Sequence, residues 1–291
     1  MGKLFHRLLY RCLSLENYLR VVSRLFFLYR ALGLGRRGRA LEYVYHLSQL
    51  VAEGDTVIDI GANLGYYTCP LADLVGAKGR VYAVEPVPVI FSVLKRNVGS
   101  RKNVTLLNYA LGEECRTIEM ANDSVASAGY FGTGRNFVSD GELSKDAVRF
   151  TAQMQRGSEL FADLERVDFI KCDIEGYERV VLPELRPIIE CHHPTVLVET
   201  DGESRRQMIE MFTELGYKAF MLEAGREVEL DPESDKDIIF RFINHYHSGA
   251  IYGDQSPCLR RGFRGGSDLQ MRPEVASRVK NSGEFEIKTR T

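Results

Sequence analysis

The 291-residue chain has no tryptophan, no Cys-x-x-Cys pair and no long uninterrupted apolar run. A membrane-spanning helix needs about 18 consecutive apolar residues, so we expect none here. The six cysteines are scattered without metal-ligand spacing, which argues against a disulfide framework and a zinc site. Arginines interrupt each apolar stretch near the start, so no cleavable leader is expected. These absences predict a reduced, cytoplasmic protein.

The whole chain also has no strong net charge, although its segments differ in charge. The chain holds 38 Lys and Arg against 40 Asp and Glu, which gives no general reason to expect a polyanionic partner. Residues 1–49 hold 9 basic and 2 acidic residues, whereas residues 50–247 hold 21 basic and 33 acidic residues. An acidic middle is unsuited to a phosphate backbone, so we expect no nucleic-acid partner.

The patterning predicts three parts. Residues 1–49 form a basic helical arm, residues 50–247 a catalytic domain, and residues 248–291, which are rich in Gly, Ser and Arg, a disordered tail. The favoured interpretation of the arm is a helical cap packed on the domain. The second interpretation is a surface helix on anionic lipid, because basic amphipathic character is typical of such helices. That reading would make the protein peripheral at a membrane.

Short apolar runs alternate with helical patterns through the middle of the chain. This alternation predicts an α/β fold with a doubly wound, mostly parallel sheet. Residues 118–160 interrupt the rhythm as a Gly- and Ser-rich insertion, and a segment this long is usually functional. The expected strands are 56–60, 80–84, 104–108, 167–172, 195–199, 217–222 and 237–242, and the expected helices are 66–74, 90–98, 177–190 and 204–215.

The most informative segment is the turn after the first expected strand. That strand ends in Asp59, and the chain then turns through Gly61, Asn63 and Gly65 into a helix. Glycine suits this place because the backbone must bend tightly and lie against a ligand. The next strand ends in Glu85, and an acid at that position can accept both hydroxyls of a ribose.

The spacing of the turn discriminates between nucleoside cofactors. The nicotinamide fingerprint G-x-G-x-x-G is absent, because Gly61 and Gly65 stand four apart. This spacing leaves fewer free amides to hold a pyrophosphate. Asp59 would repel a pyrophosphate but would suit the cationic amino-acid end of S-adenosylmethionine. We therefore expect S-adenosylmethionine as the cofactor, with a nicotinamide-dependent oxidoreductase as a less favoured alternative.

Five stretches together resemble the FkbM family of S-adenosylmethionine-dependent methyltransferases. They are DIGANLGYYT at 59–68, VEP at 84–86, NYALG at 108–112, FIKCDIEGYE at 169–178 and VLVE at 196–199. They follow the family's order over residues 50–245. The resemblance implies a Rossmann-like, seven-stranded class I methyltransferase fold whose last strand is antiparallel. It also implies methylation of hydroxyl groups, often on sugars or natural products.

The resemblance also implies a set of cofactor-binding residues. The methionine part would lie on the loop of Asp59, the ribose at Glu85 and the adenine past the third strand. The full set is Asp59, Gly61, Asn63, Gly65, Glu85, Asn108, Ala110 and Asp173. The chain departs from the family pattern at Thr200-Asp201, where a hydrophobic residue and His are common. It departs again at Pro183-Glu184, which replace a glycine. Both departures concern the acceptor side.

Candidate catalytic residues alternate at the end of the fourth expected strand. Lys171, Asp173 and Glu175 should point the same way by strand periodicity. Methyl transfer to oxygen needs positioning and a base that takes the hydroxyl proton. Asp173 and Glu175 are candidate bases, and Lys171 would keep one of them ionised. The alternative is structural: Glu175 caps the following helix and Asp173 orders the loop.

Two further alternatives concern a metal and the function. Asp173, Glu199 and Asp201 offer oxygen ligands for Mg²⁺, but their spacing does not demand it, and we expect no metal. The expected function is O-methylation of a small molecule or glycan, with the insertion 118–160 as lid or acceptor-recognition element. A non-catalytic scaffold that keeps the fold is the alternative from another class. The sequence predicts no oligomeric state.

Overall fold

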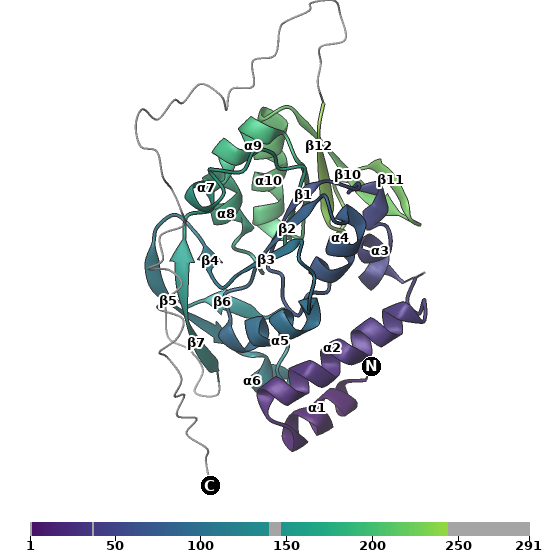
Figure 1. Cartoon of the computed structure of the whole chain (residues 1–291), viewed down its shortest axis with the longest axis vertical. Coiled ribbons are helices and arrows are strands. Elements are labelled where there is room, and N and C mark those ends of the chain that lie inside the picture. The colour runs from purple at the N-terminus through teal and green to yellow at the C-terminus, as the bar shows by residue number, and fades with distance from the viewer. Residues whose placement is uncertain (1, 37, 140–146, 244–291) are drawn as a thin grey trace, which may run out of the picture. The chain divides into compact units, whose positions relative to one another are not determined.

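The computed structural model describes residues 2–36, 38–139 and 147–243 (Figure 1). The tail predicted for 248–291 lies outside the described residues. Among those that are described, no helix is both long and apolar enough to cross a membrane. Cys12, Cys69, Cys115 and Cys172 carry free thiols.

Eight strands form the main sheet, in the order β11-β10-β12-β9-β8-β1-β2-β3. The five strands from β9 to β3 are parallel, and β12 is antiparallel to both of its neighbours. The predicted doubly wound, mostly parallel sheet with an antiparallel last strand is therefore confirmed. The bounds are β1 Thr56–Ile60, β2 Arg80–Val84, β3 Val104–Leu107, β8 Phe169–Cys172, β9 Thr195–Val198, β10 Tyr217–Glu223, β11 Arg226–Glu229 and β12 Ile238–Phe242.

The eighth strand corrects the predicted count of seven. β11 pairs with β10 through a two-residue hairpin turn at Ala224 and Gly225, which both have positive φ angles, 49° and 76°. Two-residue turns of this kind usually carry Asn-Gly or Asp-Gly. Because alanine stands at the first position, the sequence lacked the ordinary hairpin signal.

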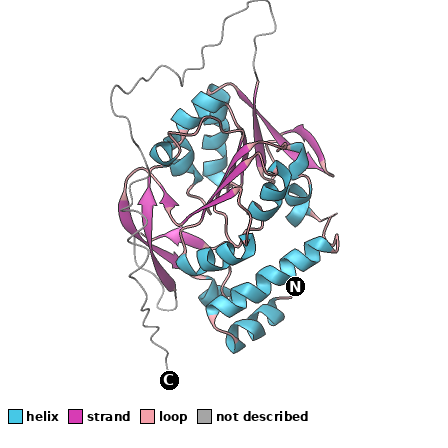
Figure 2. Cartoon of the chain, viewed as in Figure 1, coloured by secondary structure: helices cyan, strands magenta, loops and turns pink. Residues whose placement is uncertain are grey.

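Helices cover both faces of the main sheet (Figures 1 and 2). Ile58 packs in one buried cluster with Phe212 of α10, whereas the adjacent Val57 packs in another with Leu71 of α4. Alternate residues of β1 thus serve opposite faces, as strand geometry requires. The helices are α4 Thr68–Val75, α5 Pro88–Val98, α8 Glu178–Glu184, α9 Arg186–His192 and α10 Gly202–Glu214. The helix predicted over 177–190 is divided at Leu185, because Pro187 lacks an amide hydrogen for the helical ladder.

The arm packs on α5 through its second helix. α1 (Lys3–Cys12) ends before Ser14, whose hydroxyl accepts the Asn17 amide at 3.4 Å and begins α2 (Leu15–Ala31). α2 buries Tyr18 and Leu19 in the cluster that contains Ile90 of α5. Short turns then lead into the domain: η1 Arg39–Leu41, α3 Glu42–Tyr45 and η2 Leu47–Gln49. The arm therefore packs on the domain through α2, and its role as a cap stays a prediction.

Much of the insertion forms a second, four-stranded sheet, in the order β4-β7-β5-β6. Ile118 and Met120 on β5 and Ala152 and Met154 on β7 alternate with exposed residues and bury one face of this sheet. The bounds are β4 Ala110–Leu111, β5 Arg116–Asn122, α6 Ser124–Ala128, β6 Asn136–Val138, β7 Val148–Gln155 and α7 Gly157–Leu160. The Gly- and Ser-rich segment thus contributes to a sheet with its own apolar face.

Candidate functional site

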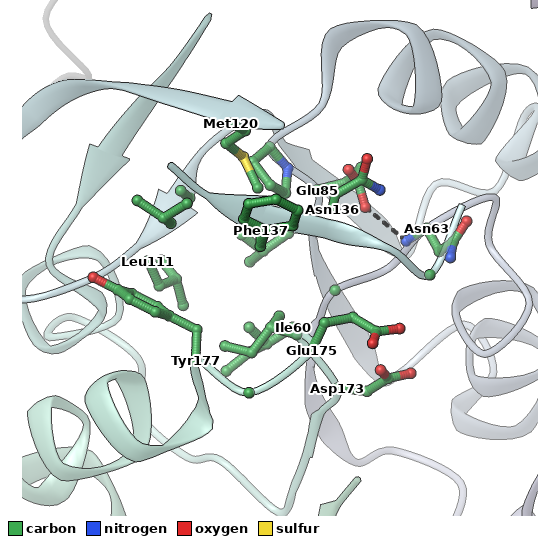
Figure 3. Close-up of a pocket in the computed structure, with 18 of the residues that line it drawn as sticks. Ile60, Asn63, Glu85, Leu111, Met120, Asn136, Phe137, Asp173, Glu175 and Tyr177 are labelled. Carbon is green, nitrogen blue, oxygen red and sulfur yellow. Dashed lines mark hydrogen bonds between the residues drawn. The ribbon is translucent and has the colours of Figure 1, made fainter. Parts of the chain in front are cut away.

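A cavity of about 380 Å³ opens at the carboxyl ends of the parallel strands (Figure 3). Gly61 after β1, Glu85 after β2 and Asp173 after β8 line it, and Asn136 and Phe137 of β6 form the facing wall. Ligands of doubly wound sheets bind at this edge. The fold therefore brings together groups that lie more than a hundred residues apart in the chain.

The turn after β1 is shaped by two residues with left-handed backbone conformations. Gly61 has φ 77°, and a Cβ there would overlap the carbonyl oxygen of Asp173. Asn63 has φ 52°, and its side-chain oxygen accepts the amide of Leu64 at 2.8 Å. The Asn63 amide donates to Oε2 of Glu85 at 2.9 Å, so the turn is tied to the end of β2.

Glu85 faces the cavity from a buried position. Its Oε1 accepts the Val87 amide at 2.9 Å, while Oε2 holds Asn63. The side chain belongs to a residue only 5% exposed, and this burial raises the pKa of Glu85 to about 7. Each carboxylate oxygen has a second lone pair free for a ligand hydroxyl. The geometry at Glu85 therefore suits a ribose.

Asn108 and Ala110 have separate tasks. The Asn108 amide donates to the carbonyl oxygens of Glu85 at 2.7 Å and Pro86 at 3.1 Å, which fixes the loop after β2. Asn108 does not line the cavity, whereas Ala110 and its neighbour Tyr109 do. Tyr109 was not among the residues predicted for the site.

Asp59 and Gly65 lie behind the turn instead of lining the cavity. Asp59 is fully buried and accepts the Thr68 hydroxyl at 2.6 Å, and burial raises its pKa. Gly65 has φ 89°, and a Cβ there would lie only 3.1 Å from Cδ1 of Leu94. These two predicted cofactor residues therefore shape the turn and the start of α4 in the structure.

Lys171 is buried beneath the turn and joins three groups. Its Nζ lies 2.9 Å from Oδ2 of Asp173 and 3.8 Å from Asp59, and it donates to the Gly61 carbonyl at 3.1 Å. Burial by itself lowers the pKa of Lys171. The carboxylates of Asp173 and Asp59 outweigh this effect and hold the pKa above its ordinary value. A permanent ammonium thus faces Asp173, whose side chain is 28% exposed and opens into the cavity.

Two further carboxyls surround Asp173. Glu199 follows β9 and lines the same cavity, and partial burial with the charges of Asp173 and Asp237 raises its pKa to about 8. Glu175 lies at a positive φ of 57°, and partial burial with the charges of Asp173 and Glu178 raises its pKa to about 7. Figure 3 shows Asp173 and Glu175 on the same side of the cavity.

Glu175 does not stand at the N-cap position of α8, which Tyr177 occupies. Glu178 begins α8, and its Oε1 accepts the Ile174 amide at 2.8 Å. Glu175 instead lines the cavity beside Gly134 of the insertion. The strand alternation expected from Lys171 through Glu175 ends at Asp173, because β8 stops at Cys172 and the chain turns.

The insertion supplies cavity residues that the sequence analysis did not identify. Asn136 and Phe137 of β6 point into the cavity, together with Met120 of β5 (Figure 3). Their place depends on β6 pairing with β5, for which the sequence carries only a three-residue strand. The unusual length of the insertion was the one sequence feature that indicated a part in the site.

The alternative magnesium site gains no support. Asp201 is exposed and lines neither this cavity nor its neighbour. Within residues 2–36, 38–139 and 147–243, no group of three acidic, His or Cys side chains has the geometry to hold a metal. That no metal is needed stays a prediction.

The charge of the cavity indicates what it can hold. Its charged lining residues are Glu85, Asp173, Glu175 and Glu199, and no described lining residue is Lys or Arg. Such a lining suits a cationic ligand and disfavours a pyrophosphate. One acid at the end of β2 and three acids at the far end of the cavity would suit a nucleoside that carries positive charge.

Comparison with known proteins gives a family match over the same residues. The model of the Methyltransferase FkbM domain matches residues 59–219. The protein-L-isoaspartate O-methyltransferase of Methanosarcina mazei is 41% identical over 59 residues, which are 20% of this chain and 24% of that protein. The corresponding protein of Methanothrix thermoacetophila is 35% identical over 57 residues, 19% of this chain and 27% of that protein. The chain thus spans about a quarter of the length of these relatives.

Solved structures align more broadly at low identity. A methyltransferase FkbM from Methylobacillus flagellatus covers 66% of this chain and 45% of its own, with 15% identity and a TM-score of 0.43. Fibrillarin from Aeropyrum pernix, solved with natively bound S-adenosyl-L-methionine, covers 67% of this chain and 71% of its own. Its identity is 19% and its TM-score 0.39.

Proposed function

The chain belongs to the FkbM family of S-adenosylmethionine-dependent methyltransferases, and we propose that it methylates a hydroxyl oxygen of a small molecule or a glycan. The observation that carries this proposal is the pairing of Lys171 with Asp173 at the end of the acidic cavity. That pair offers a carboxylate base where a cofactor held at Glu85 would end. The match to the family confirms the resemblance of the five sequence stretches.

The cavity residues fit S-adenosylmethionine. Glu85 would hold the ribose hydroxyls, Ala110 and Tyr109 would lie against the adenine, and Gly61 and Asn63 would line the methionine part. The acidic far end suits the ammonium and sulfonium charges. When bound, the cofactor supplies an electrophilic methyl group.

Asp173 is the proposed base. Transfer to oxygen is an in-line displacement that needs a group to take the hydroxyl proton as the new bond forms. The ammonium of Lys171 at 2.9 Å orients the Asp173 carboxylate toward the cavity. Partial burial and the charges of Asp173 and Asp237 raise the pKa of Glu199, so this side chain holds a proton more readily than an ordinary glutamate. Asp173, which Lys171 pairs, is therefore the proposed acceptor of the substrate's proton. Glu175 is the second candidate at the rim.

The alternatives make different demands. A nicotinamide-dependent oxidoreductase needs a pyrophosphate site, which the acidic lining disfavours. A nucleic-acid acceptor is disfavoured by the same acidic edge. A non-catalytic scaffold would bind the cofactor without needing the Lys171–Asp173 pair.

The test is the variant Asp173→Asn. It should bind S-adenosylmethionine with less than a threefold change in Kd. Label transfer from tritiated S-adenosylmethionine to hydroxyl acceptors should fall at least 100-fold, the usual contribution of a general base. Glu190→Gln, an exposed acid on α9, is the matched control. Undiminished transfer by Asp173→Asn would remove this residue as the base.

We also propose a peripheral membrane contact for the arm. Leu4 is 80% exposed and Leu8 61% exposed on α1, beside the basic residues Lys3 and Arg11. Apolar side chains flanked by cations are what an anionic lipid surface binds. The packing of α2 on the domain leaves this part of α1 uncovered within the described residues.

A further inference from the structure

A second cavity, of about 540 Å³, lies beside the first. Asp173 and Glu199 line both cavities, so the two meet at these carboxyl groups. The remaining walls of the second cavity come from the arm, from the start of α4 and from the stretch that enters β12. The insertion, which covers the first cavity, contributes none of the described residues here.

The arm and α4 supply an aromatic wall. Phe26 of α2 and Tyr66 lie with ring centroids 4.1 Å apart, and Tyr67 follows. Tyr67 also lies against the buried ammonium of Lys171, at 5.1 Å from its ring centroid. Flat aromatic faces next to carboxyl groups bind the apolar face of a ring while the acids take its hydroxyls.

The opposite wall is fixed by contacts from behind. The Tyr43 hydroxyl donates to the Asp237 carbonyl at 2.5 Å, and Nη1 of the buried Arg205 donates to the Lys236 carbonyl at 2.8 Å. These bonds hold the stretch that presents the Asp237 side chain to the cavity. The wall is therefore preformed.

The charges of the second cavity are acidic in balance. The two cationic side chains among its described lining residues are already paired: Lys236 with Glu42 at 3.0 Å, and Arg39 with Asp235. The other acids of the lining are Asp173, which Lys171 pairs from behind the wall, Glu199 and Asp237. Burial with the nearby Asp173 charge raises the pKa of Asp237 to about 6. A phosphate or carboxylate ligand would meet repulsion here and find no unpaired cation among these lining residues.

We propose that this second cavity binds the methyl acceptor, and that it selects an uncharged hydroxyl-bearing ring over an anionic one. The inference rests on the proposed function, since the first cavity must hold the cofactor. The acceptor oxygen then forms its bond to the methyl carbon at the junction. The carbon–sulfur bond breaks with its electrons on sulfur, and the hydroxyl proton passes to Asp173. The arm, with Phe26, is thus a specificity element, whereas the insertion covers the cofactor.

The experiment uses the full chain saturated with S-adenosylhomocysteine. Saturation-transfer NMR and titration measure the binding of methyl hexopyranosides, each paired with the methyl glycoside of its uronic acid. Neutral glycosides should bind at least tenfold more tightly than their carboxylate partners. S-adenosylhomocysteine affinity is measured separately by calorimetry, and it reports on the proposed function alone.

Two variants locate the site. Phe26→Ala should weaken glycoside binding at least fivefold and leave S-adenosylhomocysteine affinity unchanged, whereas Leu28→Ala, exposed on the same helix, should change neither. Asp237→Asn should reduce the ratio between the Kd of each acidic glycoside and the Kd of its neutral partner. Retained nucleoside binding shows that each variant is folded.

The outcomes separate the two proposals. If no neutral glycoside binds the S-adenosylhomocysteine complex, or if uronic acids bind as well, the acceptor assignment is wrong while the proposed function stands. If Phe26→Ala weakens the nucleoside as much as the glycoside, the second cavity holds the cofactor's amino-acid end instead. If the wild-type chain binds no S-adenosylhomocysteine, the proposed function itself fails.

Discussion

Glu85 joins two backbone turns through one carboxylate and still faces the cavity. Its oxygens hold the amides of Asn63 and Val87, each at 2.9 Å. The same residue would therefore organise the cofactor site and bind the ribose. Because its two contacts are to backbone amides, its position depends little on other side chains.

We expect Glu85→Ala to weaken S-adenosylmethionine binding at least tenfold, or about 1.4 kcal/mol, because a charged hydrogen-bond acceptor is lost. Calorimetric titration measures the change. Glu114→Ala, an exposed acid paired with Arg116, is the control and should bind as the wild type does. An unchanged Kd in Glu85→Ala, with the fold intact by circular dichroism, would remove Glu85 from the cofactor site.

At individual residues, the sequence predicts a place in the cavity correctly where a residue directly follows a strand. Gly61, Glu85 and Asp173 follow β1, β2 and β8 and line the cavity. Asp59 was placed at the ligand but is the penultimate residue of β1, and its side chain turns to α4 and Thr68. Which side of a turn a residue serves depends on the packing of the next helix, and no spacing rule supplies that.

At the scale of elements, the second sheet explains why a Gly- and Ser-rich segment can form a wall. β5 and β7 pair over seven residues and bury Met120 and Met154 beneath them. This sheet positions β6, so Phe137 reaches the cavity with 37% of its surface exposed (Figure 3). With the cofactor in this cavity, the second sheet would cover it, and a change in the apolar lining of the sheet should alter the affinity for the nucleoside.

Phe137→Ala should raise the Kd of S-adenosylhomocysteine roughly fivefold, about 1 kcal/mol, through lost apolar contact. Titration of the variant beside Thr117→Ala, on the exposed face of β5, measures the effect. Thr117→Ala should leave the Kd unchanged. An affinity within twofold of wild type for Phe137→Ala would show that the insertion does not touch the cofactor.

The strands were predictable because each buried run alternates with a helix, and β1 and β2 have the expected bounds. The departures occur where a local signal was weak or ambiguous. Ala224 takes the place of the usual Asn or Asp in the hairpin turn before β11, and Ser14 begins a second helix within the predicted helical arm. The pairing of β5 with β7 spans a segment of low periodicity, so only the tertiary fold reveals it.

At the scale of the whole chain, the basic arm and the acidic domain would bind different kinds of partner. The arm packs on α5 through Tyr18 and Leu19, and it also contributes Phe26 to the second cavity. Its first helix keeps Leu4 and Leu8 exposed. One segment would thus link a lipid surface to the proposed acceptor site.

We expect the full chain to co-sediment with vesicles of phosphatidylcholine and phosphatidylserine more than with phosphatidylcholine alone. The double variant Lys3→Glu/Arg11→Glu should bind at least roughly 30-fold less, because each of the two basic side chains contributes about 1 kcal/mol near an anionic surface. Lys218→Glu, exposed on β10, is the control. Equal sedimentation with both vesicle types would contradict the membrane proposal.

The central claim is that the acidic cavity holds S-adenosylmethionine for methyl transfer. Its most direct test is calorimetric titration of the purified chain with S-adenosylmethionine, S-adenosylhomocysteine and NAD. The account predicts saturable heat with a single site for the first two nucleosides and none for NAD. Binding of NAD, or no heat from either methionine nucleoside, would contradict it.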